Sequence, residues 1–208
     1  DVLPVTEKTP RHEAESPYGN TKVMSEDIIR DLMRVEPDMK ALALRYFNPI
    51  GAHPTAFIGE LPNGVPNNLI PYLTQTAIGI REQLSVFGDD YNTPDGSPLR
   101  DYIDVVDLAQ AHVVAIRRLL DGKNKKNYEF FNIGTGKALS VLEIIHAFER
   151  ATGVKVNYKV VGRRAGDIEK VWADTTLANN ELGWKAVTPI EETLANAWKW
   201  QKSLEATN

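Results

Sequence analysis

Cysteine is absent from the 208 residues, which excludes several classes of site at once. A chain without thiols cannot form a disulfide framework, a thiolate zinc site or a cysteine nucleophile. The four histidines show no metal-ligand spacing, so we predict no metal centre. The lack of cysteine and of N-x-S/T acceptors fits a reducing compartment, and we predict a cytoplasmic protein.

Long apolar runs and an excess of basic charge are also missing. No run approaches the roughly 20 apolar residues that cross a bilayer, and the polar start does not resemble a secretory signal. The chain has 24 Lys and Arg against 28 Asp and Glu, a net charge of -4. This balance gives no electrostatic footprint for nucleic acid or for an anionic membrane, and we predict neither partner.

A glycine-rich phosphate-binding turn is the third absence. Nucleotide-binding α/β folds place such a turn between the first strand and its helix. Gly134-Thr135-Gly136 lacks the third glycine of the pattern, and we interpret it as a strand-to-helix turn. Because the first residue is Asp rather than Met, we expect the chain to be part of a longer one, with the phosphate cradle upstream.

What is present is an alternation of strand and helix patterns, which is typical of an α/β protein. Helices are predicted from Pro17 to before Pro37, over 71–80, over 105–120 behind Asp104, over 141–152 between a Ser140 capping box and Gly153, and after a Thr188 capping box. Strands are predicted over 41–47, 84–87, 128–133 and 154–161, with long polar loops over 51–68 and 88–98.

Tyr18 and Lys22 lie four residues apart on the first predicted helix, so they share one face. A neighbouring ammonium favours the ionised form of a phenol, and a tyrosinate can take or return a proton on a substrate hydroxyl. The pattern Y-x-x-x-K is weak alone, and an exposed tyrosine beside a solvated lysine is the plain alternative.

Further segments follow this pair in a fixed order. They are Ser16–Lys22, Leu44–His53, Pro66–Pro71, Val86–Tyr91, Asp95–Leu108, Arg163–Asp167 and Trp172–Asp174. In this order and spacing the whole chain resembles the C-terminal three-fifths of nucleotide-sugar epimerases in the extended short-chain dehydrogenase/reductase family. The resemblance implies the C-terminal part of a Rossmann-type doubly wound fold, plus a smaller mixed α/β domain that binds a UDP-sugar. Residues 1–49 would belong to the first, residues 50–208 to the second, and 104–134 would pack back on the Rossmann sheet.

The resemblance also implies site residues. Tyr18 would be the catalytic base, Lys22 would bind the nicotinamide ribose, and Tyr46 would line the NAD and sugar pocket. The implied substrate contacts are Tyr46, Phe47, Asn48, Asn68, Leu69, Ser85, Val86, Phe87, Arg100, Arg164, Asp167 and Val171. Among them Arg100 and Arg164 would hold the diphosphate, Ser85 to Phe87 the uracil and Asp167 the ribose. Several of these residues also have a purely structural interpretation. Phe87 could belong to the core, Arg100 and Asp101 could form a surface ion pair, and Asn48-Pro49 could be only a turn.

The implied activity is an NAD-dependent interconversion of UDP-glucose and UDP-galactose, in galactose metabolism, through a 4-keto intermediate. Val171 stands where family members carry a residue beside the sugar C2 substituent, so its small side chain leaves room for N-acetylated substrates. The helix over 16–36 would form a homodimer. Alternatives are a UDP-sugar dehydratase, decarboxylase or reductase, and a non-catalytic nucleotide-sugar-binding module.

Overall fold

A computed structural model describes residues 2–11, 13–14 and 16–205 of the chain. Its helices are α1 (Pro17–Val35), α2 (Leu69–Ala77), α3 (Val105–Leu120), α4 (Val141–Thr152) and α5 (Ile190–Glu205), with a π-helix η1 (Ala178–Leu182). Its strands are β1 (Ala41–Tyr46), β2 (Asn48–Ile50), β3 (Leu84–Phe87), β4 (Leu99–Asp104), β5 (Tyr128–Ile133), β6 (Ala138–Ser140), β7 (Tyr158–Val161) and β8 (Lys170–Val171). The predicted α/β class is confirmed.

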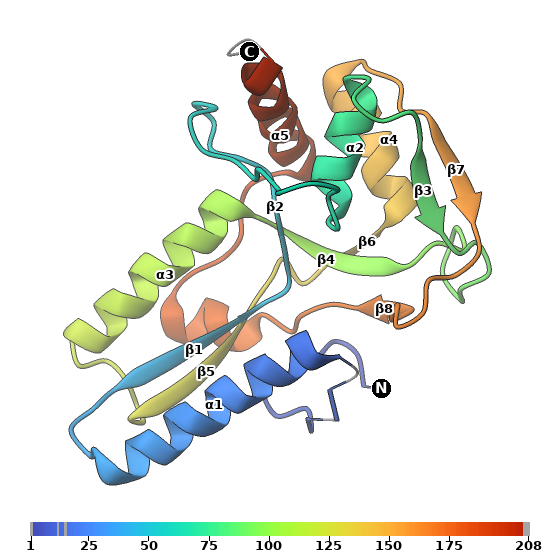
Figure 1. Cartoon of the computed structure of the whole chain (residues 1–208). Helices are drawn as coiled ribbons and strands as arrows, with labels where there is room; N and C mark the ends of the chain where they lie inside the picture. Colours follow the sequence, from blue (N-terminus) through green and yellow to red (C-terminus); the bar gives the residue numbers. More distant parts are fainter. Residues whose placement is uncertain (1, 12, 15, 206–208) are drawn as a thin grey trace.

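The strands form three small groups. β1 pairs in parallel with β5, and β3 pairs in parallel with β7. In the third group β4 lies between β2 and β6 and also pairs with β8. Figure 1 shows β1 and β5 running between α1 and α3, whereas α2, α4 and α5 gather at the other end of the molecule. No helix among the described residues is long and apolar enough to cross a membrane.

Strand β4 contributes to both hydrophobic cores of the structure. Because side chains alternate along a strand, its neighbours Tyr102 and Ile103 point to opposite faces. Tyr102 joins a core built mainly from α2, α4, α5 and β3, with Phe148 and Leu194 fully buried. Ile103 joins a second core between α3, β5 and η1, which contains Trp184. The strand therefore connects the two halves of the molecule.

Three buried aspartates on β4 and at the start of α3 fix the segments around them. Asp101 accepts hydrogen bonds from the backbone N–H groups of Thr135, Gly136 and Ala173 and from the Thr135 hydroxyl. Asp104 caps α3 through the N–H of Val106 and accepts from the Thr193 hydroxyl on α5. Asp107 accepts from the N–H groups of two residues in the segment before α5. A buried carboxylate needs such donors, so each aspartate ties a distant segment to the strand.

The capping signals at the start of α1 and at both ends of α4 are confirmed. The Ser16 hydroxyl accepts from the N–H of Gly19 at the start of α1. Ser140 and Glu143 form the capping box of α4, and Gly153 ends that helix in the left-handed conformation. These signals depend on neighbours within a few residues, which explains why sequence predicts them well.

Several predicted boundaries are wrong, for physical reasons. α2 begins at Leu69 rather than Pro71, because proline is tolerated within a first helical turn. β7 begins at Tyr158 rather than Val154, since side chains of Thr152 and Glu149 take the N–H groups of Val154 and Val156.

The last helix and the Asn48-Pro49 step also differ from expectation. α5 begins at Ile190; the N–H of Thr188 donates to Asp107, and Glu191 pairs with Arg150 instead of closing a capping box. Asn48 and Pro49 form strand β2 beside β4 rather than a turn.

Helix α1 carries apolar side chains at helical spacing, but they are not buried. Every residue of this helix is described, and none is buried. Met24, Ile28, Leu32 and Val35 remain between 39% and 70% exposed. Strand β1 is likewise only partly buried, rather than the buried strand predicted. Helical periodicity identifies an apolar face without saying what covers it.

Replacing Asp101 with asparagine should destabilise the fold by about 3 kcal/mol, because the new amide NH2 would face backbone donors in a buried site. Urea unfolding measures the change. Asp121→Asn, on a half-exposed side chain paired with Lys123, is the matched control and should cost less than about 0.5 kcal/mol. Equal effects for the two variants would contradict the structural role of Asp101.

Candidate active site

A large cavity joins α1 and β1 to β3, β4 and the segment around Arg164. Its volume is about 1160 Å³, which is somewhat above the usual range for small-molecule sites. Of the residues expected at the site, it is lined by Tyr18, Lys22, Tyr46, Phe47, Asn48, Asn68, Leu69, Ser85, Phe87, Arg100, Arg164 and Asp167. The fold thus brings together residues that lie up to 149 positions apart in the chain, counted from Tyr18 to Asp167.

The first turns of α1 present Tyr18 and Lys22 to the cavity. The Lys22 ammonium lies 5.0 Å from the centre of the Tyr18 ring, a cation–π contact that keeps the two side chains together. Tyr18 is 73% exposed, so a substrate hydroxyl can reach its phenol. The pair thus places a phenol at the surface of the cavity with a cation over its ring, and a phenol in such a place is able to exchange a proton with a bound hydroxyl.

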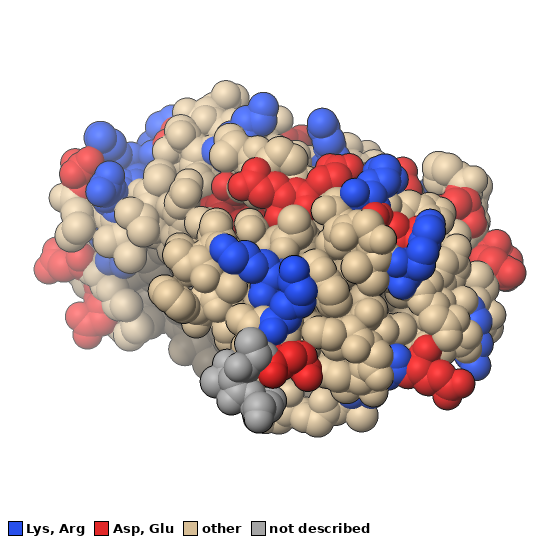
Figure 2. All heavy atoms as spheres, turned by 90° about the horizontal axis from the view of Figure 1, so that it is seen from above, with Lys and Arg blue, Asp and Glu red and all other residues tan. Residues whose placement is uncertain are grey.

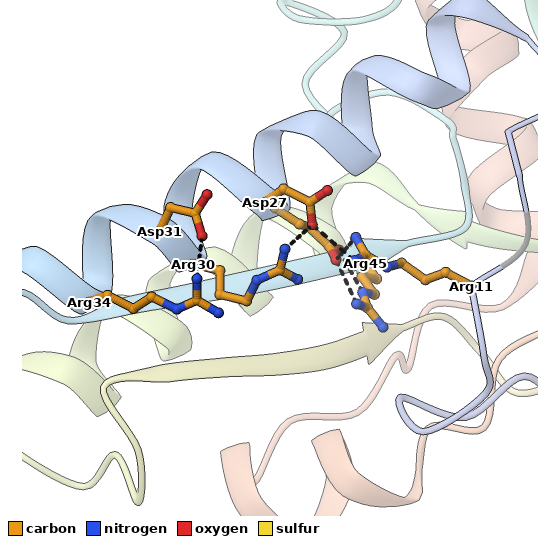
Figure 3. A network of polar contacts seen from close by, with 7 residues as sticks. Arg11, Asp27, Arg30, Asp31, Arg34 and Arg45 are labelled. Carbon is orange, nitrogen blue, oxygen red and sulfur yellow. Dashed lines mark hydrogen bonds and ion pairs between the residues drawn. The ribbon is translucent and has the colours of Figure 1, made fainter.

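Ionic contacts rather than apolar packing hold α1 against β1. Arg45 on β1 donates two hydrogen bonds of 2.7 Å to the two carboxylate oxygens of Glu26 on α1. Arg11 and Arg30 both pair with Asp27, at 2.9 and 2.7 Å, as Figure 3 shows. Hydrogen bonding to Glu26 raises the pKa of Arg45, and the hydrogen bond from Arg11 lowers the pKa of Asp27. A bidentate pair fixes direction as well as distance, so it sets how Tyr18 faces the cavity.

The end of β1 and the start of β2 form the next wall. The Tyr46 ring lies 6.3 Å from the His112 ring of α3, and the N–H of Phe47 donates to the carbonyl of Ile133. These contacts place Asn48 at the cavity edge with its side chain exposed.

The loop before α2 supplies Asn68 together with a residue that the sequence analysis missed. The Asn68 side chain makes no capping hydrogen bond to α2; its Nδ2 donates to Glu60 at 2.6 Å. Glu60 lines the cavity as well, and its carbonyl accepts from the indole N–H of Trp200 on α5. No periodicity or spacing in the sequence distinguishes Glu60 from its neighbours in this irregular loop.

Strand β3 divides its residues between cavity and core. Ser85 and Phe87 line the cavity, while Val86 is 1% exposed and points into the first core. Strand alternation turns the Val86 side chain inward, so of the three residues expected to hold the uracil only Ser85 and Phe87 line the cavity. The reading of Phe87 as ordinary core is wrong.

Two arginines provide positive charge in the cavity. The Arg164 guanidinium lies 5.3 Å from the Phe87 ring centre and pairs with Asp167 at 2.8 Å. Arg100 donates to the carbonyl of Leu99, and its neighbour Asp101 is fully buried, so they are not a surface ion pair. Tyr102 also lines the cavity, and burial raises its pKa to about 12, so its hydroxyl stays protonated as a donor.

The turn at Gly134–Gly136 does not form a phosphate cradle. The N–H groups of Thr135 and Gly136 donate to Asp101 at 2.8 and 3.1 Å, so neither is free for an anion. The segment is a turn and not a phosphate loop, but it joins β5 to β6 rather than a strand to a helix as predicted.

Val171 and the described histidines are not among the residues that line the cavity. Val171 sits on β8 opposite Arg100 of β4, and it is not among the described residues that line the cavity. No group of three described histidine, aspartate or glutamate residues is arranged to hold a metal ion. His12 lies outside the described residues.

Both charge signs occur over the face shown in Figure 2, where acidic and basic side chains stand among larger areas of other residues.

Comparisons with known proteins give consistent results. A family model described as GDP-mannose 4,6 dehydratase matches residues 1–197. The UDP-glucose 4-epimerase of Bacillus subtilis (strain 168) is 50% identical over 203 residues, covering 98% of this chain and 59% of the relative. The structure of a UDP-glucose-4-epimerase from Stenotrophomonas maltophila, with bound NAD and formylated UDP-arabinopyranose, is 47% identical with a TM-score of 0.95. It is matched over 100% of this chain and 61% of its own.

A second solved structure is the UDP-glucose 4-epimerase of Bifidobacterium longum in complex with NAD+ and UDP. It is 44% identical with a TM-score of 0.91, matched over 97% of this chain and 59% of its own. The chain therefore spans about three-fifths of the length of these relatives.

Proposed function

From the premise that the chain belongs to the family described as GDP-mannose 4,6 dehydratase, within the extended short-chain dehydrogenase/reductases, we propose that it carries the substrate-binding part of a UDP-glucose 4-epimerase. The proposed activity is the NAD-dependent interconversion of UDP-glucose and UDP-galactose, as part of galactose metabolism. The observation that carries the proposal is the shared cavity, in which a tyrosine–lysine pair meets two arginines, an aromatic ring and an aspartate.

The nucleotide would occupy the side formed by β3, β4 and the Arg164 segment. Phe87 offers an aromatic face for the uracil, and Ser85 offers a hydroxyl beside it. Arg100 and Arg164 carry the fixed, fork-shaped donors that suit a diphosphate. Asp167 would accept from the ribose hydroxyls with the carboxylate lone pairs that its pairing with Arg164 leaves available.

Five further residues complete the substrate set. Asn48 and Asn68 provide amide donors near the diphosphate, and Leu69 packs against the nucleotide. Phe47 and Tyr46 border the sugar. The hydrogen bond from Asn68 to Glu60 leaves one N–H of its amide free for a phosphate oxygen.

The nicotinamide end of NAD fits the α1 side of the cavity. Tyr18, Lys22 and Tyr46 line it together, which is the donor set expected for the nicotinamide ribose. When bound, NAD supplies a reversible hydride acceptor. The 208 residues contain no glycine-rich turn for the cofactor phosphates, and the Gly134–Gly136 turn is already occupied by Asp101.

Tyr18 would take the proton from the sugar 4-hydroxyl as the 4-keto sugar forms. The arginine-bound diphosphate keeps the substrate attached while the sugar turns within the cavity. Tyr18 then returns the proton after reduction on the other face. Remote contacts to the nucleotide are thus used to keep a reactive intermediate in place.

The alternatives remain distinguishable by product. A dehydratase, as the family description would suggest, releases water and yields a deoxy-keto sugar, whereas a decarboxylase or reductase changes the composition of the sugar in other ways. A non-catalytic module would bind UDP-sugars without turnover. The identity of 44–50% to proteins named as epimerases favours the epimerase.

Fusing this chain behind the part of the Stenotrophomonas epimerase that it does not cover should give turnover of UDP-galactose, whereas the 208-residue chain alone should give none.

In the fusion, Tyr18→Phe should lower kcat by about 10²- to 10⁴-fold with little change in substrate affinity, since only the proton-transfer group is lost. A coupled assay that detects UDP-glucose measures the turnover of the fusion, of its Tyr18→Phe variant and of the chain alone. Turnover by the chain alone, or equal losses of binding and rate, would contradict the assigned roles.

Val171 is proposed to set substrate size. Its β8 position faces Arg100 across the β4 pairing, which places it beside the cavity wall rather than in it. We propose that its small side chain allows N-acetylated UDP-hexoses to react as well as the plain pair.

Val171→Tyr in the fusion should lower kcat/KM for the N-acetylated pair selectively, by about tenfold or more, because the added ring excludes the acetamide. Val187→Tyr, at a residue that is 72% exposed and outside the cavity lining, is the control. A ratio of the two kcat/KM values that Val171→Tyr leaves unchanged would remove Val171 from the site.

The exposed face of α1 supports a homodimer. Met24, Ile28, Leu32 and Val35 recur at helical spacing on a face that nothing in the chain covers among the described residues. We expect light scattering to give the dimer mass for the fusion and the monomer mass after Ile28→Glu. A monomeric fusion would exclude this interface, and so would a dimer that Ile28→Glu leaves intact.

The division of the chain and its compartment complete the proposal. We assign residues 1–49 to the NAD-binding domain and 50–208 to the UDP-sugar domain; the pairing of β1 with β5 supports the return of 104–134 to the first. A cytoplasmic location is supported by the complete lack of cysteine.

A further inference from the structure

The loop over 88–98 holds the segment that carries Arg164 and Asp167 at both of its ends. At one end Arg163 Nε donates to the Asp90 carboxylate at 2.7 Å, and its Nη2 donates to the Asp90 carbonyl at 2.9 Å. At the other end the N–H of Asn92 donates to Glu169 at 3.1 Å. The segment between these two ends includes Gly166 with a positive φ of 80°, so it would otherwise have wide conformational freedom.

An aromatic contact fixes the first of these ends. The Arg163 guanidinium lies 4.0 Å from the centre of the Tyr91 ring, and Tyr91 itself is 6% exposed. The ring packs against Gly88, where a Cβ would lie 2.4 Å from a Tyr91 ring atom and 3.2 Å from Arg163 Cγ. Close packing on the buried Tyr91 ring restricts the side-chain conformation of Arg163, whereas an isolated surface ion pair would leave that side chain free to move.

The three residues of this clasp, Asp90, Tyr91 and Arg163, are not among the described residues that line the cavity. Arg164 and Asp167, which the clasp brackets, do line it. Arg163 therefore points away from the cavity while its neighbour points into it. Any effect of the clasp on a ligand has to pass through Arg164 and Asp167.

We propose that the Asp90–Tyr91–Arg163 clasp is a positioning device that presents Arg164 and Asp167 to the diphosphate and ribose of the substrate. The proposal rests on the proposed function, because it takes a nucleoside diphosphate as the ligand of this cavity. Its physical basis is preorganisation: two polar side chains on a glycine-containing loop are ordered before the ligand arrives, so binding loses less conformational entropy.

Calorimetric titration of UDP into the 208-residue chain tests this directly. Arg163→Ala and Asp90→Ala should each weaken UDP binding by about tenfold, since the ordering of Arg164 and Asp167 is lost. The double variant should be no weaker than either single variant, because both substitutions open the same clasp. Arg34→Ala, which removes an exposed ion pair with Asp31 on α1, is the matched control and should leave UDP affinity within twofold.

A second comparison separates positioning from a general effect on stability. In an Arg164→Ala/Asp167→Ala background, Arg163→Ala should weaken UDP binding by less than twofold, because both residues that the clasp positions are already gone. A full tenfold effect in that background would overturn the proposal, and so would unchanged affinity in the Arg163→Ala single variant. Failure of the unsubstituted chain to bind UDP would instead contradict the proposed function, so the two failures are distinguishable.

Discussion

Buried carboxylates along β4 and the first turn of α3 are the constraint on which the rest of the structure depends. Asp101, Asp104 and Asp107 are each buried away from water, and each accepts hydrogen bonds from donors in a different part of the chain. Through these bonds one strand fixes the turn after β5, the segment after β8, the start of α3 and the approach to α5. Arg100 lies near the start of the same strand, so one wall of the cavity is built on a strand that these hydrogen bonds hold in place.

The cavity combines this rigid side with a side that is held more loosely. α1 contacts β1 chiefly through Arg45 and Glu26 and leaves its apolar face exposed. The nucleotide side instead rests on the first core and on the 88–98 loop. An epimerase of the proposed kind needs this difference, because the nucleotide has to stay fixed while the sugar changes orientation.

Sequence predicted well those features that depend on nearby residues. The Ser16 cap, the Ser140–Glu143 box and the Gly153 end follow from hydrogen bonds within one helical turn. The sequence-based predictions fail where a group that is distant in the sequence determines the local structure. Asp107 takes the N–H of Thr188 across 81 positions, and β2 forms only because β4 lies beside it. The candidate site was predicted largely from resemblance; Glu60 and Tyr102 line it too, and no local pattern marked either one.

The central claim is that one cavity receives the nucleoside diphosphate between Arg100, Arg164 and Phe87. A crystal structure of the 208-residue chain with UDP tests it most directly. The account predicts the uracil against the Phe87 ring and the diphosphate between the two guanidinium groups. UDP bound elsewhere on the chain, with this cavity unchanged, would contradict it.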